Sequence, residues 1–185
     1  APRTGSTSQA QAPGFGNASL QIGQPQFDGA AGGCTTPTTA GCAEQLIYPF
    51  TVTPQDTNFV YAYAIIIENP GHSTFDQPFV SIGIYDSNGD SIPCGYFKYV
   101  ASGSLPGFYT SSSAGSLYKP WTLVGINLSA YVGQTLSIVI TNVDCAQGGH
   151  FAHSYWDFKC GAFTTNPASF CVGQSVTIAA PSDPL

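Results

Sequence analysis

Charge is what this chain has least of. Only 8% of its 185 residues are charged, with four basic residues against ten acidic ones and a net charge of −6. Ordinary globular proteins carry about 25% charged residues. So few basic side chains offer no electrostatic footprint for nucleic-acid phosphates or anionic lipid, which argues against both as partners. Solubility must come from Ser, Thr, Asn, Gln and Gly instead, as is typical of secreted proteins.

Long apolar runs and methionine are missing as well. The longest apolar candidate, Phe59 to Ile67, is far shorter than the ~20 residues of a membrane-spanning helix, so no membrane insertion is expected. The chain has no Met and opens on Ala1-Pro2 without an apolar leader, which favours a processed or excised product. A hydrophobic fraction of 43%, with 13% aromatic residues, argues against disorder and suffices for one core domain.

Helical periodicity is also absent, and apolar residues recur with a period of two. The alternation over 80–84, 124–128 and 136–140 predicts strands with one buried face. The segment Phe59 to Glu68 is apolar on both faces and predicts a central strand. Only "AEQLI", 43–47, suits a single helical turn.

Turn signals separate these runs at "ENPGH" (68–72), "DSNGD" (86–90) and "SGSLPG" (102–107). The second also resembles the start of a calcium loop. Its glycine stands in the fourth place rather than the sixth, so a tight hairpin is the favoured interpretation. Roughly eight to ten short strands predict an all-β fold, an antiparallel two-sheet sandwich of jelly-roll or lectin-like type.

Composition divides the chain into three parts. Residues 1–16 are rich in Ser, Gln, Ala, Pro and Gly and predict an N-terminal arm or linker. Residues 17–163 form the predicted β-sandwich domain. Residues 164–185 restart an alternating pattern at Val172, Val176 and Ile178, which predicts a linker and the first strand of a following Ig-like module. Neighbouring modules of the same polypeptide are therefore expected partners.

The six cysteines have no C-x-x-C spacing, and their even number predicts disulfides formed in an oxidising compartment. We expect Cys34 to pair with Cys42 as a local staple. The other four are expected to tie strand ends, in a pairing that the spacing leaves open: Cys94, Cys145, Cys160 and Cys171.

The stretch "VDCAQGGHFAHSYWDFKC", 143–160, concentrates polar chemistry. Zinc would need His150 and His153 together with a carboxylate of Asp144 or Asp157, but positions 150 and 153 of an extended strand point to opposite faces. Structure is the favoured interpretation, with a tight turn at Gly148-Gly149 followed by the last core strand.

Calcium is a better candidate than zinc, because jelly-roll sandwiches often hold a structural calcium near a sheet edge. By that analogy, Asp157 on the last strand would face the N-terminal segment near Asn17 and Asp28. These three residues form the predicted Ca²⁺ site.

Catalytic signals are weak. Glu44 and Glu68 are the only glutamates, and neither lies in a motif for paired-carboxylate chemistry. "GHSTF" and "GSLPG" both fail the nucleophile-elbow pattern. His72 is interpreted as a loop residue in preference to a partner of the His150 region. We therefore expect no enzymatic activity.

Aromatic residues exceed what one inter-sheet core needs. Sugar-binding sandwiches stack pyranose faces on exposed Trp or Tyr side chains. Tyr155 and Trp156 are adjacent on a strand, so one should face the core and the other solvent. The predicted ligand contacts are the outward one of this pair and Trp121, which follows Pro120 at a strand start.

Several segments in order resemble a module of large surface proteins from gliding bacteria that use the type IX secretion pathway, often beside PKD or immunoglobulin-like repeats. The resemblance covers about 17–160, most of the chain. It rests on "SLQIG" (19–23), "YPFTVTP" (48–54), "FVYAYAIIIENPGH" (59–72), "QPFVSIGIYDSNGDSIPCGYF" (77–97), "YKPWTLVGINLSAYVGQTLSIVITNVDCAQGGHF" (118–151) and "YWDFKC" (155–160).

The resemblance implies a secreted, cell-surface location, a jelly-roll or lectin-like fold and an adhesive or structural role. We therefore expect a non-enzymatic surface adhesin that binds glycans or other surface ligands. A first alternative is a filament subunit that assembles by strand addition through terminal strands such as 172–180. A second is a carbohydrate-binding module of a larger enzyme.

Overall fold

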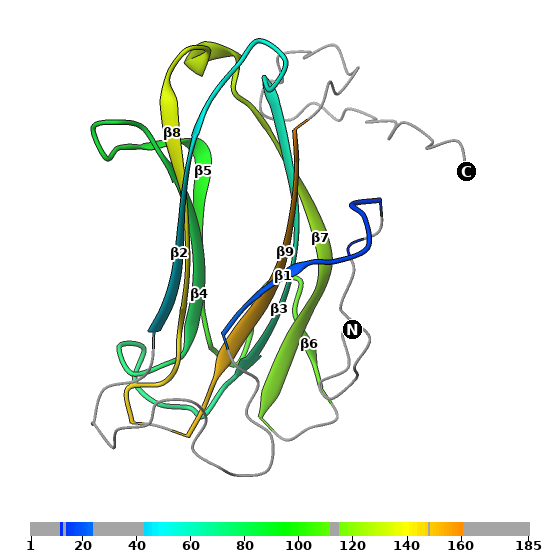
Figure 1. The fold of residues 1–185 in the computed structure, drawn as a ribbon. Helices are drawn as coiled ribbons and strands as arrows, with labels where there is room; N and C mark the ends of the chain where they lie inside the picture. The colour runs from blue at the N-terminus through cyan, green and yellow to red at the C-terminus, as the bar shows by residue number, and fades with distance from the viewer. Residues whose placement is uncertain (1–11, 13, 24–42, 112–114, 148, 161–185) are drawn as a thin grey trace, which may run out of the picture.

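The computed structural model describes residues 12, 14–23, 43–111, 115–147 and 149–160. These residues form nine strands and one short 3-10 helix (Figure 1), which confirms the all-β prediction. The elements are β1 (Leu20–Ile22), β2 (Ala43–Thr51), β3 (Asn58–Glu68), β4 (Phe79–Tyr85), β5 (Ser91–Val100), β6 (Tyr109–Thr110), β7 (Ser116–Asn127), η1 (Ser129–Tyr131), β8 (Thr135–Val143) and β9 (Ala152–Cys160).

The strands form two antiparallel sheets packed face to face (Figure 1). One sheet has the order β1-β9-β3-β7-β6 and the other the order β2-β8-β4-β5. The chain changes sheet at most connections, and only the β4–β5 and β6–β7 connections stay within one sheet. This alternation of strands between two sheets is the double Greek key of a jelly roll, as the turn spacing predicted.

The core follows directly from the apolar periodicity. Residues 59–67 of β3 are all at most 7% exposed, so this strand is buried on both faces as predicted. Its odd-numbered residues join the inter-sheet core, where Tyr63 stacks on Trp156 of β9 with ring centroids 5.5 Å apart. Opposite them, β8 contributes Leu136, Ile138 and Ile140. Aromatic pairs of this kind each contribute about 0.5–1.5 kcal/mol beyond their buried area.

The "DSNGD" stretch forms the predicted hairpin between β4 and β5. The Asp86 carboxylate accepts hydrogen bonds from the backbone N–H groups of Asn88 (2.8 Å) and Asp90 (3.0 Å). Gly89 takes a φ of 87°, a conformation that glycine adopts without strain. The carboxylate therefore closes a turn, in line with the choice of a hairpin over a calcium loop.

The helical turn predicted for 43–47 is wrong. These residues begin β2, which pairs with β8 over its whole length from Ala43 opposite Val143 to Thr51 opposite Thr135. A partner strand that satisfies a full ladder of backbone hydrogen bonds overrides a weak local preference for one helical turn.

The described cysteines lie apart from one another. Cys145 precedes β9 and Cys160 ends it, so the two lie at opposite ends of a nine-residue strand, about 30 Å long at 3.3 Å per residue. No bridge joins Cys94, Cys145 and Cys160 to each other, and Cys94 and Cys160 are exposed thiols. Cys34, Cys42 and Cys171 lie outside the described residues, as do the predicted Ig-like strand and most of the N-terminal arm.

Candidate functional site

The sandwich is closed at one end of the β1–β2 edge and opens toward the other. At the closed end, the Gly23 N–H donates to the Glu44 carboxylate (2.7 Å), and the buried Asn142 amide donates to the Ile22 carbonyl (2.7 Å). These bonds join β1 to β2 and β8. Toward the open end, β1 begins only at Leu20, while β2 and β9 run on to Thr51 and Cys160.

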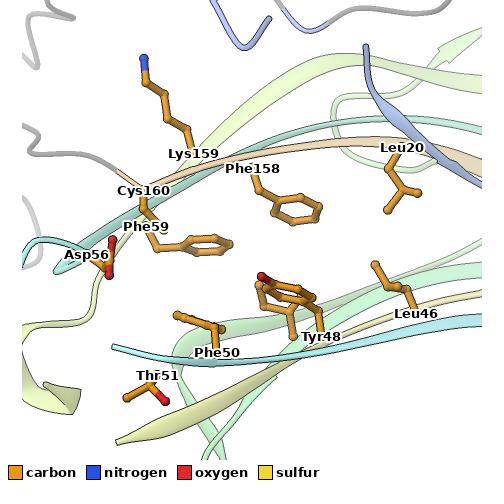
Figure 2. A pocket seen from close by; sticks show the side chains of 11 residues that line it. Leu20, Leu46, Tyr48, Phe50, Thr51, Asp56, Phe59, Phe158, Lys159 and Cys160 are labelled. Carbon is orange, nitrogen blue, oxygen red and sulfur yellow. The ribbon is translucent and has the colours of Figure 1, made fainter. Parts of the chain in front are cut away.

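A groove of about 490 Å³ lies between the sheets at this open end (Figure 2). Aromatic and aliphatic side chains form both walls, and polar groups gather at one end. The volume is within the range of about 300–1,000 Å³ that ligand sites occupy. Its lining consists of Leu20, Leu46, Tyr48, Phe50, Thr51, Asp56, Phe59, Ile138, Phe158, Lys159 and Cys160.

Two side chains on the inner face are exposed where a closed sandwich would bury them. Leu20 lies opposite Trp156 and Tyr48 opposite Ile138 in their ladders. Leu20 is 41% exposed and Tyr48 58%, whereas Trp156 and Ile138 are 0% and 3% exposed. Figure 2 shows Leu20 and Tyr48 on opposing walls of the groove. Exposed apolar surface that continues into the core marks a place where another molecule can pack.

Aromatic rings from both sheets face one another across the groove (Figure 2). Phe59 stacks on Phe50 from the facing sheet (5.8 Å between centroids) and on Phe158 from β9 (6.0 Å). At the polar end, burial and the nearby Asp56 carboxylate raise the pKa of the Cys160 thiol. The thiol therefore stays protonated near neutral pH and is a poor nucleophile.

Two strand edges run along the groove. β9 pairs with β3 along residues 152–160, but with β1 only along 154–156. Among the described strands, β2 pairs with β8 alone. The outer edge of β2 and residues 157–160 of β9 thus have no described strand beside them. Such edges are templates for pairing with an added strand.

The predicted aromatic ligand contacts do not line the groove, and the prediction of Trp156 as a ligand contact is wrong. It is fully buried in the inter-sheet core, where its indole N–H donates to the Ser154 hydroxyl (2.6 Å). Tyr155 faces the opposite side of the sheet, as the alternation requires, yet is only 8% exposed because it packs against Trp121 and His153. Trp121 is half-buried. Packing on both faces of β9 therefore leaves no flat, exposed aromatic platform at Tyr155 and Trp156.

Two of the three predicted calcium ligands, Asn17 and Asp157, lie among the described residues. Asp157 does face the N-terminal segment, where its carboxylate accepts a hydrogen bond from the Ser19 hydroxyl (2.5 Å). Asn17 is exposed two residues before Ser19, and Asp28 lies outside the described residues. Within the described part of the chain, Asp157 belongs to no cluster of three metal-binding side chains. The calcium site stays a prediction.

His150 and His153 lie in different surroundings, because His153 is in β9 whereas His150 lies in the loop before that strand. His153 is fully buried, neither ring nitrogen has a hydrogen-bond partner, and burial lowers its pKa to about 4. His150 precedes β9 and packs edge-on against His72, with ring centroids 5.2 Å apart. His72 is thus a partner of the His150 region, the alternative that the sequence alone made the less favoured one.

No protein-family model matches this chain, and no curated protein does. The resemblance to surface modules of gliding bacteria therefore remains a hypothesis carried by the quoted segments. No helix among the described residues is long and apolar enough to cross a bilayer.

Proposed function

We propose that this chain is a non-enzymatic module of a secreted cell-surface protein, with an adhesive or structural role. Its open edge binds an extended segment of another polypeptide. The observation that carries this proposal is the exposure of Leu20 and Tyr48, inner-face residues, beside two strand edges without described partners.

Strand addition uses both features of this edge. Backbone groups of an incoming segment pair with β2 or with 157–160 of β9, along the edges that have no described strand beside them. Its alternate side chains enter the groove. Covering an apolar side chain completely contributes about 1.5–3 kcal/mol. Because Leu20 and Tyr48 are already partly covered, each would contribute about half of that on binding.

The occupant that fits best is residues 172–180 of a second copy. This segment carries alternating apolar residues at Val176 and Ile178, and no charged residue occurs between 161 and 180. An uncharged, alternating strand suits a groove whose walls are aromatic and aliphatic. A groove on one copy and a strand on the next make a head-to-tail contact, which builds open fibres unless the rotation closes into a ring.

Static light scattering of the full chain over a range of concentrations tests this function. We expect concentration-dependent association that is lost in Tyr48→Asp, which places a charge in the groove, and in Val176→Asp, which places one in the incoming strand. Phe75→Ser is the matched control, because Phe75 is 98% exposed and does not line the groove. This control should associate like the wild type.

Two outcomes would count against self-assembly. A chain that is monomeric at all concentrations, and whose state neither charged variant changes, overturns the proposal. A monomer that binds an added 172–180 peptide only after Val176→Asp would place the segment in its own groove.

Glycan binding through Tyr155 and Trp156 has less support, because both side chains are buried.

A further inference from the structure

A second cluster lies at the other end of β3 and β9 from the groove. His72, Cys145 and His150 each offer one ligand atom, and these atoms all lie within 4.8 Å of one another. We propose that these three side chains bind a zinc ion. The site is separate from the groove and does not depend on the proposed function.

Two loops that are distant in sequence bring the ligands together. His72 comes from the β3–β4 connection, whereas Cys145 and His150 come from the β8–β9 connection. The Ala146 N–H donates to the Asp76 carbonyl (3.0 Å), which ties the two loops to each other. The Cys145 N–H donates to the His150 carbonyl (3.0 Å) and closes the second loop. Backbone bonds thus tie the loop that carries Cys145 and His150 to the loop that carries His72.

The spacing fits tetrahedral coordination. With Zn–S near 2.3 Å and Zn–N near 2.0–2.1 Å, neighbouring ligand atoms in a tetrahedron are about 3.3–3.6 Å apart. The Cys145 sulfur and the His150 Nδ1 are 3.3 Å apart. The largest separation in the group, within 4.8 Å, can be closed by small side-chain rotations.

An unpartnered atom provides a second, independent observation. The Nδ1 of His72 is buried and has no hydrogen-bond partner. A buried polar atom without a partner destabilises the fold, and most such atoms in proteins are satisfied. Coordination through this nitrogen would supply the missing partner.

The surrounding charge also suits a cation. The Glu68 carboxylate accepts a hydrogen bond from the Phe151 N–H (3.3 Å), next to His150, and lies near enough for its charge to interact with that histidine. Metal-binding histidines are commonly oriented and made more basic by a neighbouring carboxylate. Glu68 is placed to balance the net positive charge of a zinc–thiolate centre.

Ligand chemistry selects zinc over calcium here. One thiolate and two imidazoles are ligands for borderline-soft metals, whereas calcium takes oxygen ligands. Three protein ligands leave the fourth tetrahedral position to water or to another group. Copper can use the same ligand types and is therefore a competing outcome of the test.

The test begins with the full chain purified without chelator or reductant. Its zinc and copper content is measured by mass spectrometry, and its affinity by competition with a chromophoric chelator. We expect one zinc per chain, and at least a tenfold loss of affinity in each of His72→Gln, Cys145→Ser and His150→Gln. Cys160→Ser and Cys94→Ser are matched controls, since both thiols are exposed and lie outside the cluster, and both variants should bind zinc like the wild type.

Cobalt substitution distinguishes metal coordination by Cys145 from a purely structural role of this residue. The wild type loaded with Co²⁺ should show a thiolate-to-metal absorption band that disappears in Cys145→Ser while circular dichroism remains unchanged. Zinc affinity that none of the three cluster variants alters would overturn the proposal, as would peptide mapping that places Cys145 in a disulfide. Copper bound by these residues in preference to zinc would overturn the assignment of the metal.

Discussion

The buried histidine of β9 should make stability depend on pH in a defined direction. His153 is 0% exposed, its ring stacks on Phe151 with centroids 5.2 Å apart, and both of its nitrogens lack partners. Burial lowers its pKa from 6.5 to about 4. Between these values the unfolded chain binds a proton that the folded chain does not, so stability rises with pH from about 4 to 6.5 and is lost as pH falls through that window.

The magnitude follows from the shift. A lowering of about 2.5 pKa units corresponds to about 3 kcal/mol of unfolding free energy between pH 6.5 and 4. His153→Phe keeps a flat ring in the same packing and removes the titrating group. The variant should lose this dependence on pH. Its unfolding free energy at neutral pH should also be about 1–3 kcal/mol higher than that of the wild type, because the two buried nitrogens without partners are removed.

Urea unfolding of the wild type and of His153→Phe at several pH values from 4 to 7.5 measures the effect. Asp144 contributes with the opposite sign, because burial raises its pKa to about 6 and the folded chain therefore binds more protons than the unfolded one between pH 3.8 and 6. Since Asp144 is present in both proteins, the difference between the two curves isolates His153. If the unfolding free energies of the two proteins change in parallel across pH 4–6.5, the reasoning is refuted. His153→Gln tests whether removal of the titrating group alone, without an aromatic ring in its place, removes the pH dependence.

Three further outcomes can be checked. Asp144→Asn should stabilise the fold at pH 7 by about 1–2 kcal/mol, because the substitution removes a partly buried charge while the amide oxygen can still accept the Ala152 N–H. This free energy is reduced from the full pKa shift because Asp144 is partly exposed. Equal stability of the two proteins at pH 7 would contradict the prediction. Trp156→Ala should destabilise the core by about 3–5 kcal/mol in a denaturant titration, whereas a surface contact would change stability little. Leu20→Ser should weaken self-association in light scattering with a small change in melting temperature, because Leu20 is already 41% exposed; a collapse of the fold would show that this edge is part of the core.

Local pattern alone determined the class of fold and its central strand. Residues 59–68 are apolar at nearly every position and are followed by a turn signal. A strand with this pattern buries both of its faces, so other structure must pack against each face. The edge strand β2 was misinterpreted at 43–47 because most of its residues are exposed on both faces, which leaves no contrast between buried and exposed positions for a pattern to record.

Tertiary structure decided the sites. The alternation at Tyr155 and Trp156 correctly predicted opposite faces, but whether the outward residue meets solvent depended on Trp121 and His153 packing over it. The groove exists because β1 is short while β2 and β9 continue past it. His72 meets Cys145 and His150 because the jelly roll places the β3–β4 and β8–β9 connections at one end of the sandwich. Sequence periodicity reports which face a residue takes on its own strand, whereas a site is made by the partner that a distant strand brings to that face.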